Sequence, residues 1–344
     1  MKKISYLILV LFLSFTSFFI AKELGANPSN NLQGNTIQNL RTDTVHFNSS
    51  MINNGWKWLS FPSLDILNAN GDSALNVLSD ILDYQIIDYA KTQTYQIRWI
   101  ILNWQNANQI FSRTEGIKIR TIAEAEAHIS GVKIPDDTTI SLTGNNSENW
   151  VGYWLDDTQK LEDAFGHWFT DGNITSIQAQ HWSANKFMER WLIKTKNGQN
   201  PTLSYGDMVI IKCTNSISDF GWDNSTAPDP KVIFRTPKQF TYQEQSSYST
   251  IYIELDSTNL PKEIGLYVDD ICLGAAVVED TLVQVCTYSN GKKGDIELEF
   301  YYGEHIPNKR IKHYKYISLN SLDKEKKIIS LSHNSGSYYI NLKE

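Results

Sequence analysis

One short aromatic motif occurs twice in the sequence, and this repetition restricts the fold more than any other feature. The stretch 149–155 (NWVGYWL) resembles the earlier stretch 55–61 (GWKWLSF). Each opens a tract that passes through a short amphipathic segment to a glycine-led β run, at 116–119 in the first and 206–211 in the second. Two such tracts predict two tandem homologous β-rich modules.

Within each module the pattern indicates short strands and one short helix. In module 1 (47–146), Leu75, Leu78 and Leu82 fall at helical spacing, and residues 128–132 and 138–142 are expected to form a strand pair through the turn at 135–137. Module 2 (147–233) repeats this order, with a helix expected around 160–169. Its end is predicted at the Pro- and Asp-rich stretch 224–230.

From residue 234 onward the pattern changes to short alternating strands separated by turns such as 269–270 and 279–280. These strands predict an immunoglobulin-like β-sandwich over 234–320, followed by a C-terminal tail, 321–344. The expected fold class is therefore all-β, β-dominated with short helices.

The N-terminus reads as an export signal. Residues 1–21 combine two lysines with an apolar run and a terminal alanine, which predicts a signal peptide, and 22–46 is a polar stretch without periodicity that predicts a flexible leader. A signal peptide predicts that the protein is exported and that the mature chain has no membrane span. Of the three cysteines, Cys272 and Cys286 flank the expected turn at 279–280 and are candidates for a disulfide. The alternative is that all three are small buried side chains.

Composition and motifs exclude several kinds of chemistry. A formal net charge of -7 argues against nucleic acid as a partner, because phosphate binding needs a concentrated basic surface. The seven histidines lack zinc-binding spacing, and no serine-hydrolase elbow or nucleotide-binding glycine loop is present. We therefore expect no metal, no cofactor and no catalytic residue.

Aromatic side chains are the better candidates for ligand binding, since an exposed indole ring can stack on a sugar at low entropic cost. When the two motifs are aligned, Trp56 and Trp150 hold the same position, which indicates a scaffold role. Trp154 is aligned with Ser60, so it is a position at which the two copies could differ in function. The Trp-rich second module is the expected location of a glycan or peptide site. Its candidate ligand-binding residues are Trp154, Trp168, Trp182, Trp191, Trp222 and Arg190.

Two motifs resemble a known family of repeats. The strand at 150–153, preceded by 129–131 and 138–142, resembles tandem repeats that open with a Gly-Trp-Asn-Leu-Val-Gly-Tyr type strand. The stretch 263–275 (EIGLYVDDICLGA) is similar to a second module of such proteins, in which an Asp-containing turn precedes Cys-x-Gly. Those proteins are secreted or surface proteins of Gram-negative bacteria, commonly exported by the type IX route, and the resemblance covers most of 47–303. It implies export and no particular activity. No C-terminal sorting domain is evident after Tyr316, which leaves anchoring or release open.

Three functions remain open on the sequence. The first is a secreted or surface-associated, non-catalytic binding or structural protein whose partner is a polysaccharide or another envelope protein. The second is a glycan-active hydrolase that uses carboxylates such as Asp156, Asp157 or Glu162. The third is a purely architectural spacer.

Overall fold

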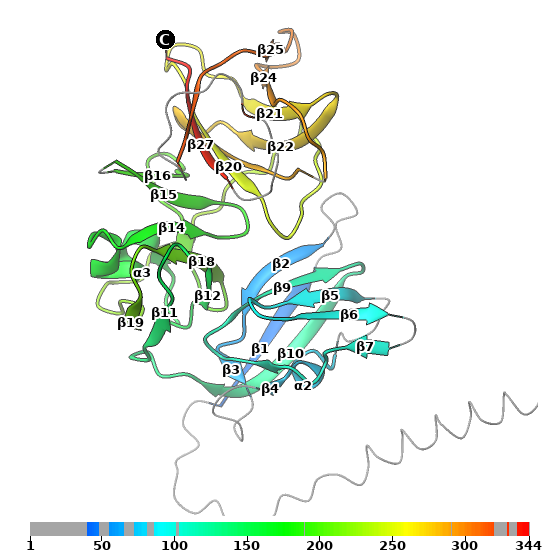
Figure 1. The fold of residues 1–344 in the computed structure, drawn as a ribbon, viewed down its shortest axis with the longest axis vertical. Coiled ribbons are helices and arrows are strands. Elements are labelled where there is room, and N and C mark those ends of the chain that lie inside the picture. The colour runs from blue at the N-terminus through cyan, green and yellow to red at the C-terminus, as the bar shows by residue number, and fades with distance from the viewer. Residues whose placement is uncertain are drawn as a thin grey trace, which may run out of the picture. The chain divides into compact units, whose positions relative to one another are not determined.

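Antiparallel β-strands make up most of the regular structure, as the sequence predicts (Figure 1). The structure, a computed structural model, describes residues 40–47, 55–64, 72–80, 86–100, 103–188, 190–289, 291–319, 329 and 336–343. The predicted signal peptide, the leader up to residue 39 and most of the predicted tail lie outside these ranges. None of the helices in the described ranges is long and apolar enough to cross a membrane.

Residues 40–133, called region 1, are organised around a five-stranded sheet. Its strands, in spatial order, are β2 (Trp56–Ser60), β9 (Gly116–Thr121), β5 (Ile87–Lys91), β6 (Gln96–Ile100) and β7 (Asn103–Gln105). The other strands form β1–β10–β3 (Leu40–Phe47, Ala125–Lys133, Ser63–Leu64) and β4–β8 (Asp72–Ser73, Ile110–Phe111). Helix α2 (Ala74–Val77) begins where the Ser73 side chain accepts a hydrogen bond from the Asn76 amide. The expected flexible leader, 22–46, thus overlaps a strand, because β1 pairs with β10 along its whole length.

Residues 140–220, called region 2, follow the same path. The main sheet consists of β12 (Asn149–Gly152), β18 (Met208–Cys213), β14 (Ile174–Gln178), β15 (Ser183–Phe187) and β16 (Arg190–Ile193). The smaller elements are β11–β19 (Ile140–Leu142, Ile217–Phe220), β13–β17 (Gln159–Lys160, Thr202–Leu203), α3 (Leu161–Phe165) and the 3₁₀ turn η1 (Gly166–Phe169). The predicted pairing of 128–132 with 138–142 is wrong, since β10 pairs with β1 and β3 whereas β11 pairs with β19.

The pairing register shows which residues of the two main sheets correspond. A β-bulge interrupts both β5–β9 and β14–β18 just after the first residue of β5 and of β14. Beyond the bulge, the last residue of β5, Lys91, pairs with Lys118 on β9, which pairs with Trp58 on β2. In the same way the last residue of β14, Gln178, pairs with Ile210 on β18, which pairs with Trp150 on β12. Trp150 therefore corresponds to Trp58. The sequence-based match of Trp150 with Trp56 was wrong by two residues.

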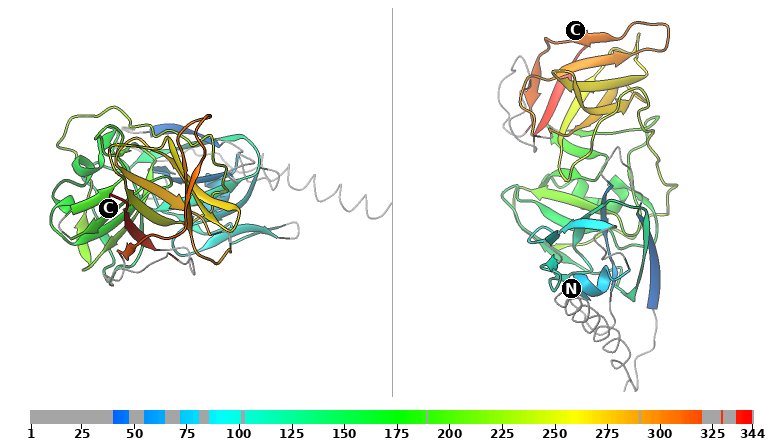
Figure 2. Two further views of the ribbon diagram at one scale, coloured as in Figure 1. Left: turned by 90° about the horizontal axis from the view of Figure 1, so that it is seen from above. Right: turned by 90° about the vertical axis from the view of Figure 1, so that its right-hand side faces the viewer.

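Region 3, residues 234–341, contains two four-stranded sheets. One has the order β23 (Leu282–Thr287), β20 (Ser249–Glu254), β27 (Ser337–Asn341), β26 (Tyr316–Ser318), and the other β22 (Ile271–Val277), β21 (Glu263–Val268), β24 (Glu297–Tyr301), β25 (Lys309–Ile311). They share one apolar core, which includes Ile251 and Leu266. The last strand, red in Figure 2, runs parallel beside the yellow β20, so part of the predicted tail belongs to this fold.

The expected hairpin turn at 279–280 was wrong, because it connects β22 and β23, which lie in different sheets. The cysteines that flank it, Cys272 and Cys286, are both free, as is the buried Cys213. The disulfide prediction therefore fails in this structure, since the two strands are not the hairpin partners that it required.

Two equivalent glutamines join regions 1 and 2. Gln93, between β5 and β6, accepts a hydrogen bond from the Trp150 amide (3.0 Å) and donates to the Glu148 carbonyl (2.6 Å). Gln180, between β14 and β15, accepts from the Trp58 amide (3.0 Å) and donates to the Trp56 carbonyl (2.7 Å). Each loop thus holds the edge strand of the other region through a side-chain amide, which can accept and donate at once.

The backbones of the two regions meet between these glutamines. The Ser60 amide donates to the Gly206 carbonyl (2.8 Å), and the Gly152 amide donates to the Thr114 carbonyl (2.9 Å). Ser60 and Gly152 hold corresponding positions, and a Cβ on Gly152 would lie 2.5 Å from the Cβ of Ser60. Only glycine fits at this crossing point.

A buried polar network joins regions 2 and 3. The Tyr252 hydroxyl accepts from Asn185 Nδ2 (2.9 Å) and donates to the Ser183 carbonyl (3.0 Å), while Gln284 Nε2 donates to Ser183 Oγ (2.8 Å). Tyr252 is fully buried. Because unsatisfied buried polar groups are costly, this network favours one relative placement of these strands.

Candidate functional site

The structure distributes the six sequence-predicted site residues over different environments. Trp154 is fully buried, and Trp222 packs edge-on against it with ring centroids 5.9 Å apart. Trp191 is half-buried, stacked on Phe169. Arg190 is exposed and pairs with Glu254 of region 3 at 3.7 Å. These residues therefore do not form one common Trp-rich face.

Trp168 lies at a shallow surface hollow of about 280 Å³. Its indole ring packs against His167, with ring centroids 4.2 Å apart, and the hollow also contains Asp219, Asp223 and part of Trp222. Trp168 is thus a partly buried aromatic side chain close to hydrogen-bonding groups.

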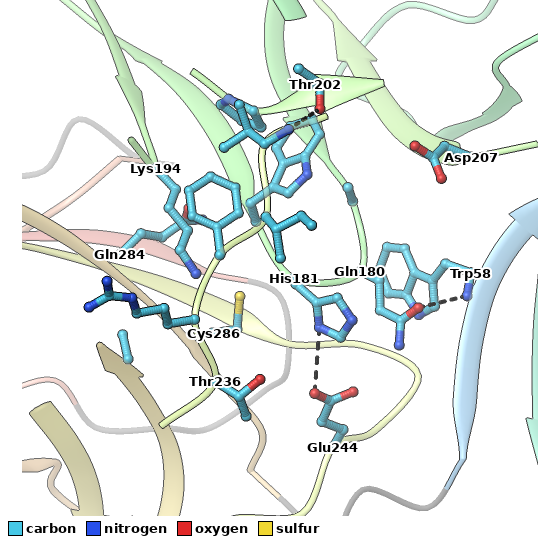
Figure 3. A pocket seen from close by; sticks show the side chains of 18 of the residues that line it. Trp58, Gln180, His181, Lys194, Thr202, Asp207, Thr236, Glu244, Gln284 and Cys286 are labelled. Atoms are coloured by element: carbon cyan, nitrogen blue, oxygen red, sulfur yellow. Dashed lines mark hydrogen bonds and ion pairs between the residues drawn. The ribbon is translucent and has the colours of Figure 1, made fainter. Parts of the chain in front are cut away.

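Trp182, the sixth predicted residue, lines a more enclosed cavity of about 500 Å³ to which all three regions contribute (Figure 3). Aromatic walls are supplied by Trp58, Trp182, Phe234, Tyr242 and Tyr288. The polar lining includes Gln180, His181, Lys194, Thr236, Glu244 and Gln284. Polar and apolar groups line this cavity in similar proportion, and a cavity of this size that combines aromatic walls with convergent polar groups can hold a small molecule.

Local structure fixes the polar groups of this cavity. Gln180 and His181 stand in the tight connection between β14 and β15, and Tyr248 of region 3 donates hydrogen bonds to the Ala179 and Trp182 carbonyls on either side of them. His181 Nδ1 lies 3.5 Å from a carboxyl oxygen of the buried Glu244 (Figure 3). The third region thereby holds the loop that presents His181.

Burial shifts the ionisable groups of the cavity toward their neutral forms. The His181 side chain is 58% accessible, but it lies inside the cavity with protein around it, and this desolvation lowers its pKa to about 4. Desolvation raises the pKa of Glu244 to about 7 and that of Cys286 to about 12, and it lowers the pKa of Lys194. The His181–Glu244 contact is therefore a contact between neutral groups between about pH 4 and 7, not an ion pair.

Two polar atoms of cavity-lining residues have no hydrogen-bond partner within the described part of the chain. They are the Trp58 indole Nε1 and the Gln284 carbonyl Oε1, both buried. Most buried polar atoms in proteins are satisfied by protein, water or ligand. Both atoms are enclosed by protein, and Figure 3 shows Trp58 and Gln284 on opposite sides of the cavity, so these atoms do not by themselves define a ligand site.

Two of the three carboxylates considered for a hydrolase, Asp156 and Glu162, have side-chain partners. Asp156 forms ion pairs with Lys133 (2.8 Å) and Arg41, which hold its pKa below the usual value despite partial burial. Glu162 accepts a hydrogen bond from Asn200 (2.9 Å). Across the described ranges, no group of three or more His, Cys, Asp or Glu side chains is close enough to hold a metal ion.

Sequence reasoning considered His181 only as a zinc ligand and did not consider Glu244. The two residues come from regions 2 and 3, and no spacing in the chain relates them. Their proximity depends on the Tyr248 hydrogen bonds, which a strand pattern does not reveal.

Comparison with known proteins adds no relative: the sequence matches no protein-family model and no curated protein, and no solved structure is detectably similar. The resemblance to secreted tandem-repeat proteins therefore stays a prediction.

Proposed function

We propose that the protein is an exported, non-catalytic binding protein that holds an uncharged, polyhydroxylated ligand, such as a neutral saccharide, in the cavity between Trp182, His181 and Glu244. The convergence of aromatic faces and hydrogen-bonding side chains on one cavity carries this proposal, because the hydroxyl groups of a sugar can both donate to and accept from groups such as Gln180 and His181.

The character of the cavity favours an uncharged ligand. His181, Glu244 and Lys194 are all shifted toward their neutral forms, so the surroundings penalise charge in general. Aromatic faces such as those of Trp182 and Tyr288 provide apolar contact for the C–H faces of a sugar ring.

We also infer that regions 1 and 2 are tandem homologous modules and that region 3 is an immunoglobulin-like sandwich. The matching strand orders, the bulge at the same position and the paired glutamines support duplication. Two sheets around one core support a sandwich. Modules joined in this way are typical of extracellular binding proteins.

Isothermal titration with a panel of neutral oligosaccharides tests the proposed site. We expect His181→Ala and Glu244→Ala to abolish binding, and Trp168→Ala, in the surface hollow, to leave it unchanged. If Trp168→Ala alone abolished binding, the site would lie at that hollow. If no neutral saccharide bound to the wild-type protein, the proposed function would be wrong.

One observation supports hydrolysis as a second candidate. A carboxyl group with a pKa of about 7, such as Glu244, can donate a proton to a leaving group near neutral pH. A hydrolase would release reducing sugar from the bound oligosaccharide, and Glu244→Gln would bind it but release none. A binding protein returns the oligosaccharide intact.

A further inference from the structure

A second cleft, of about 740 Å³, lies over the outer face of the region 2 sheet. Its floor contains a row of direct cross-strand neighbours, Lys212 on β18, Ser176 on β14 and Asn185 on β15. Gln178 stands one row further along, and Thr250 and Ser337 of region 3 form part of one wall. Neighbouring strands lie about 4.8 Å apart, so this floor presents hydroxyl, amide and ammonium groups at the short intervals of a sugar's substituents.

The charge of the cleft is opposite to that of the whole chain. Lys91, Lys118, Lys186 and Lys212 line it, whereas Glu148 is the one carboxylate among its described lining residues. Glu148 is already engaged, since it accepts from the Trp150 indole (3.0 Å) and pairs with Lys212 at 3.6 Å. Lys91 and Lys186 form no ion pair with any residue that the structure describes. In a chain with a net charge of -7, lysines thus outnumber carboxylates among the described residues of this cleft.

Lys118 lines the same cleft from a buried position, where desolvation favours its neutral form. Its ammonium nitrogen lies 3.3 Å from the centroid of the Trp58 ring and 4.5 Å from that of Trp150, and it donates to the Ser246 carbonyl (2.6 Å). The Lys91 nitrogen stands over the same Trp150 ring at 5.2 Å. Burial, and then repulsion from Lys91, hold the pKa of Lys118 well below its ordinary value. A bound anion would relieve this repulsion.

We propose that this cleft binds an oligosaccharide that carries carboxylate groups, as uronic acids do. The ammonium groups of Lys91 and Lys212 pair with the carboxylates, and Ser176 and Gln178 face the hydroxyl groups. Charged hydrogen bonds between ammonium and carboxylate supply most of the selectivity over a neutral sugar.

This second site does not depend on the proposed neutral-saccharide site. One aromatic cluster separates the two: Trp58, Met208 and Tyr288 line the cavity, and Trp150, Ile210 and Tyr248 line the cleft. The corresponding residues Trp58 and Trp150 thus contribute to different sites.

Titration calorimetry with an oligogalacturonate, and with the same oligomer fully methyl-esterified, tests the proposal on the full chain. We expect binding of the acid form that weakens with added salt, and none of the ester. Lys91→Gln and Lys212→Gln should each weaken binding by about fivefold or more. Lys293→Gln, a matched loss of charge at an exposed position outside the cleft, should not change it.

Several results would overturn the proposal: no binding of the acid form, equal binding of the ester, or an equal loss in Lys293→Gln. Unchanged melting temperatures of the variants separate lost binding from lost folding. His181→Ala and Glu244→Ala should retain oligogalacturonate binding, so failure at the cavity and failure at the cleft give different results.

Discussion

Replacing Gln180 with Ala should weaken the contact between regions 1 and 2 in a measurable way. The change removes two hydrogen bonds, of 3.0 and 2.7 Å, and leaves the Trp58 amide and the Trp56 carbonyl without that partner. At about 1 kcal/mol for each lost bond, the expected loss of unfolding free energy is about 2 kcal/mol. Urea unfolding followed by tryptophan fluorescence measures this loss as a shift of the midpoint.

Gln93 provides the matched control, because it makes the equivalent pair of bonds from an exposed position. Water can replace its bonds, so Gln93→Ala should cost less, about 0.5–1 kcal/mol. Gln180→Glu should cost at least as much as Gln180→Ala, since a carboxylate cannot donate to the Trp56 carbonyl. A loss below 0.5 kcal/mol in Gln180→Ala, or an equal loss in Gln93→Ala, would refute the reasoning that burial sets the strength of these contacts.

Three further predictions concern other parts of the structure. Tyr252→Phe should cost about 1–3 kcal/mol of unfolding free energy, because Asn185 loses a buried acceptor; a change near zero in thermal unfolding would contradict this. Between pH 4.5 and about 7, Glu244 is protonated in the folded protein and ionised in the unfolded chain. The free energy of unfolding should therefore fall by about 3 kcal/mol as pH rises through this window. Urea titrations at several pH values measure this fall, and Glu244→Gln should remove it. Gly152→Ala should cost about 1–3 kcal/mol through its clash with Ser60, and Ser60→Gly in the same chain should restore most of the loss; lack of rescue would place the strain elsewhere.

The strands could largely be predicted from the sequence, and their partners could not. The alternation of apolar residues after residue 234 predicted the short strands that the structure contains there, such as β20 to β24. Nothing local distinguishes a hairpin connection from one that crosses between sheets, which is why the turn at 279–280 was misassigned. The sequence comparison matched the first tryptophan of each motif, Trp56 and Trp150. The positions of the bulges and the contacts between the regions show instead that Trp58 corresponds to Trp150.

The candidate site was harder to predict for a similar reason. Tryptophan content drew attention to region 2, yet Trp154 and Trp222 belong to its hydrophobic core. Trp154 follows a strand that is apolar on both faces, and both faces of such a strand are covered. Of the predicted set, Trp182 lines the cavity. The groups that give the cavity its polarity, such as His181 and Glu244, meet only after region 3 packs on region 2.

Gln93 of region 1 binds region 2, and Gln180 of region 2 binds region 1 in the same way. Such a reciprocal contact has the form of an interface between two identical subunits. In a homodimer with twofold symmetry, each copy offers the same group to the same place on its partner. In the duplicated arrangement that we propose, fusion into one chain makes that contact independent of protein concentration. It also frees each copy to change alone: the position of Lys118 in one copy is Ile210 in the other, a difference that no symmetric dimer could carry.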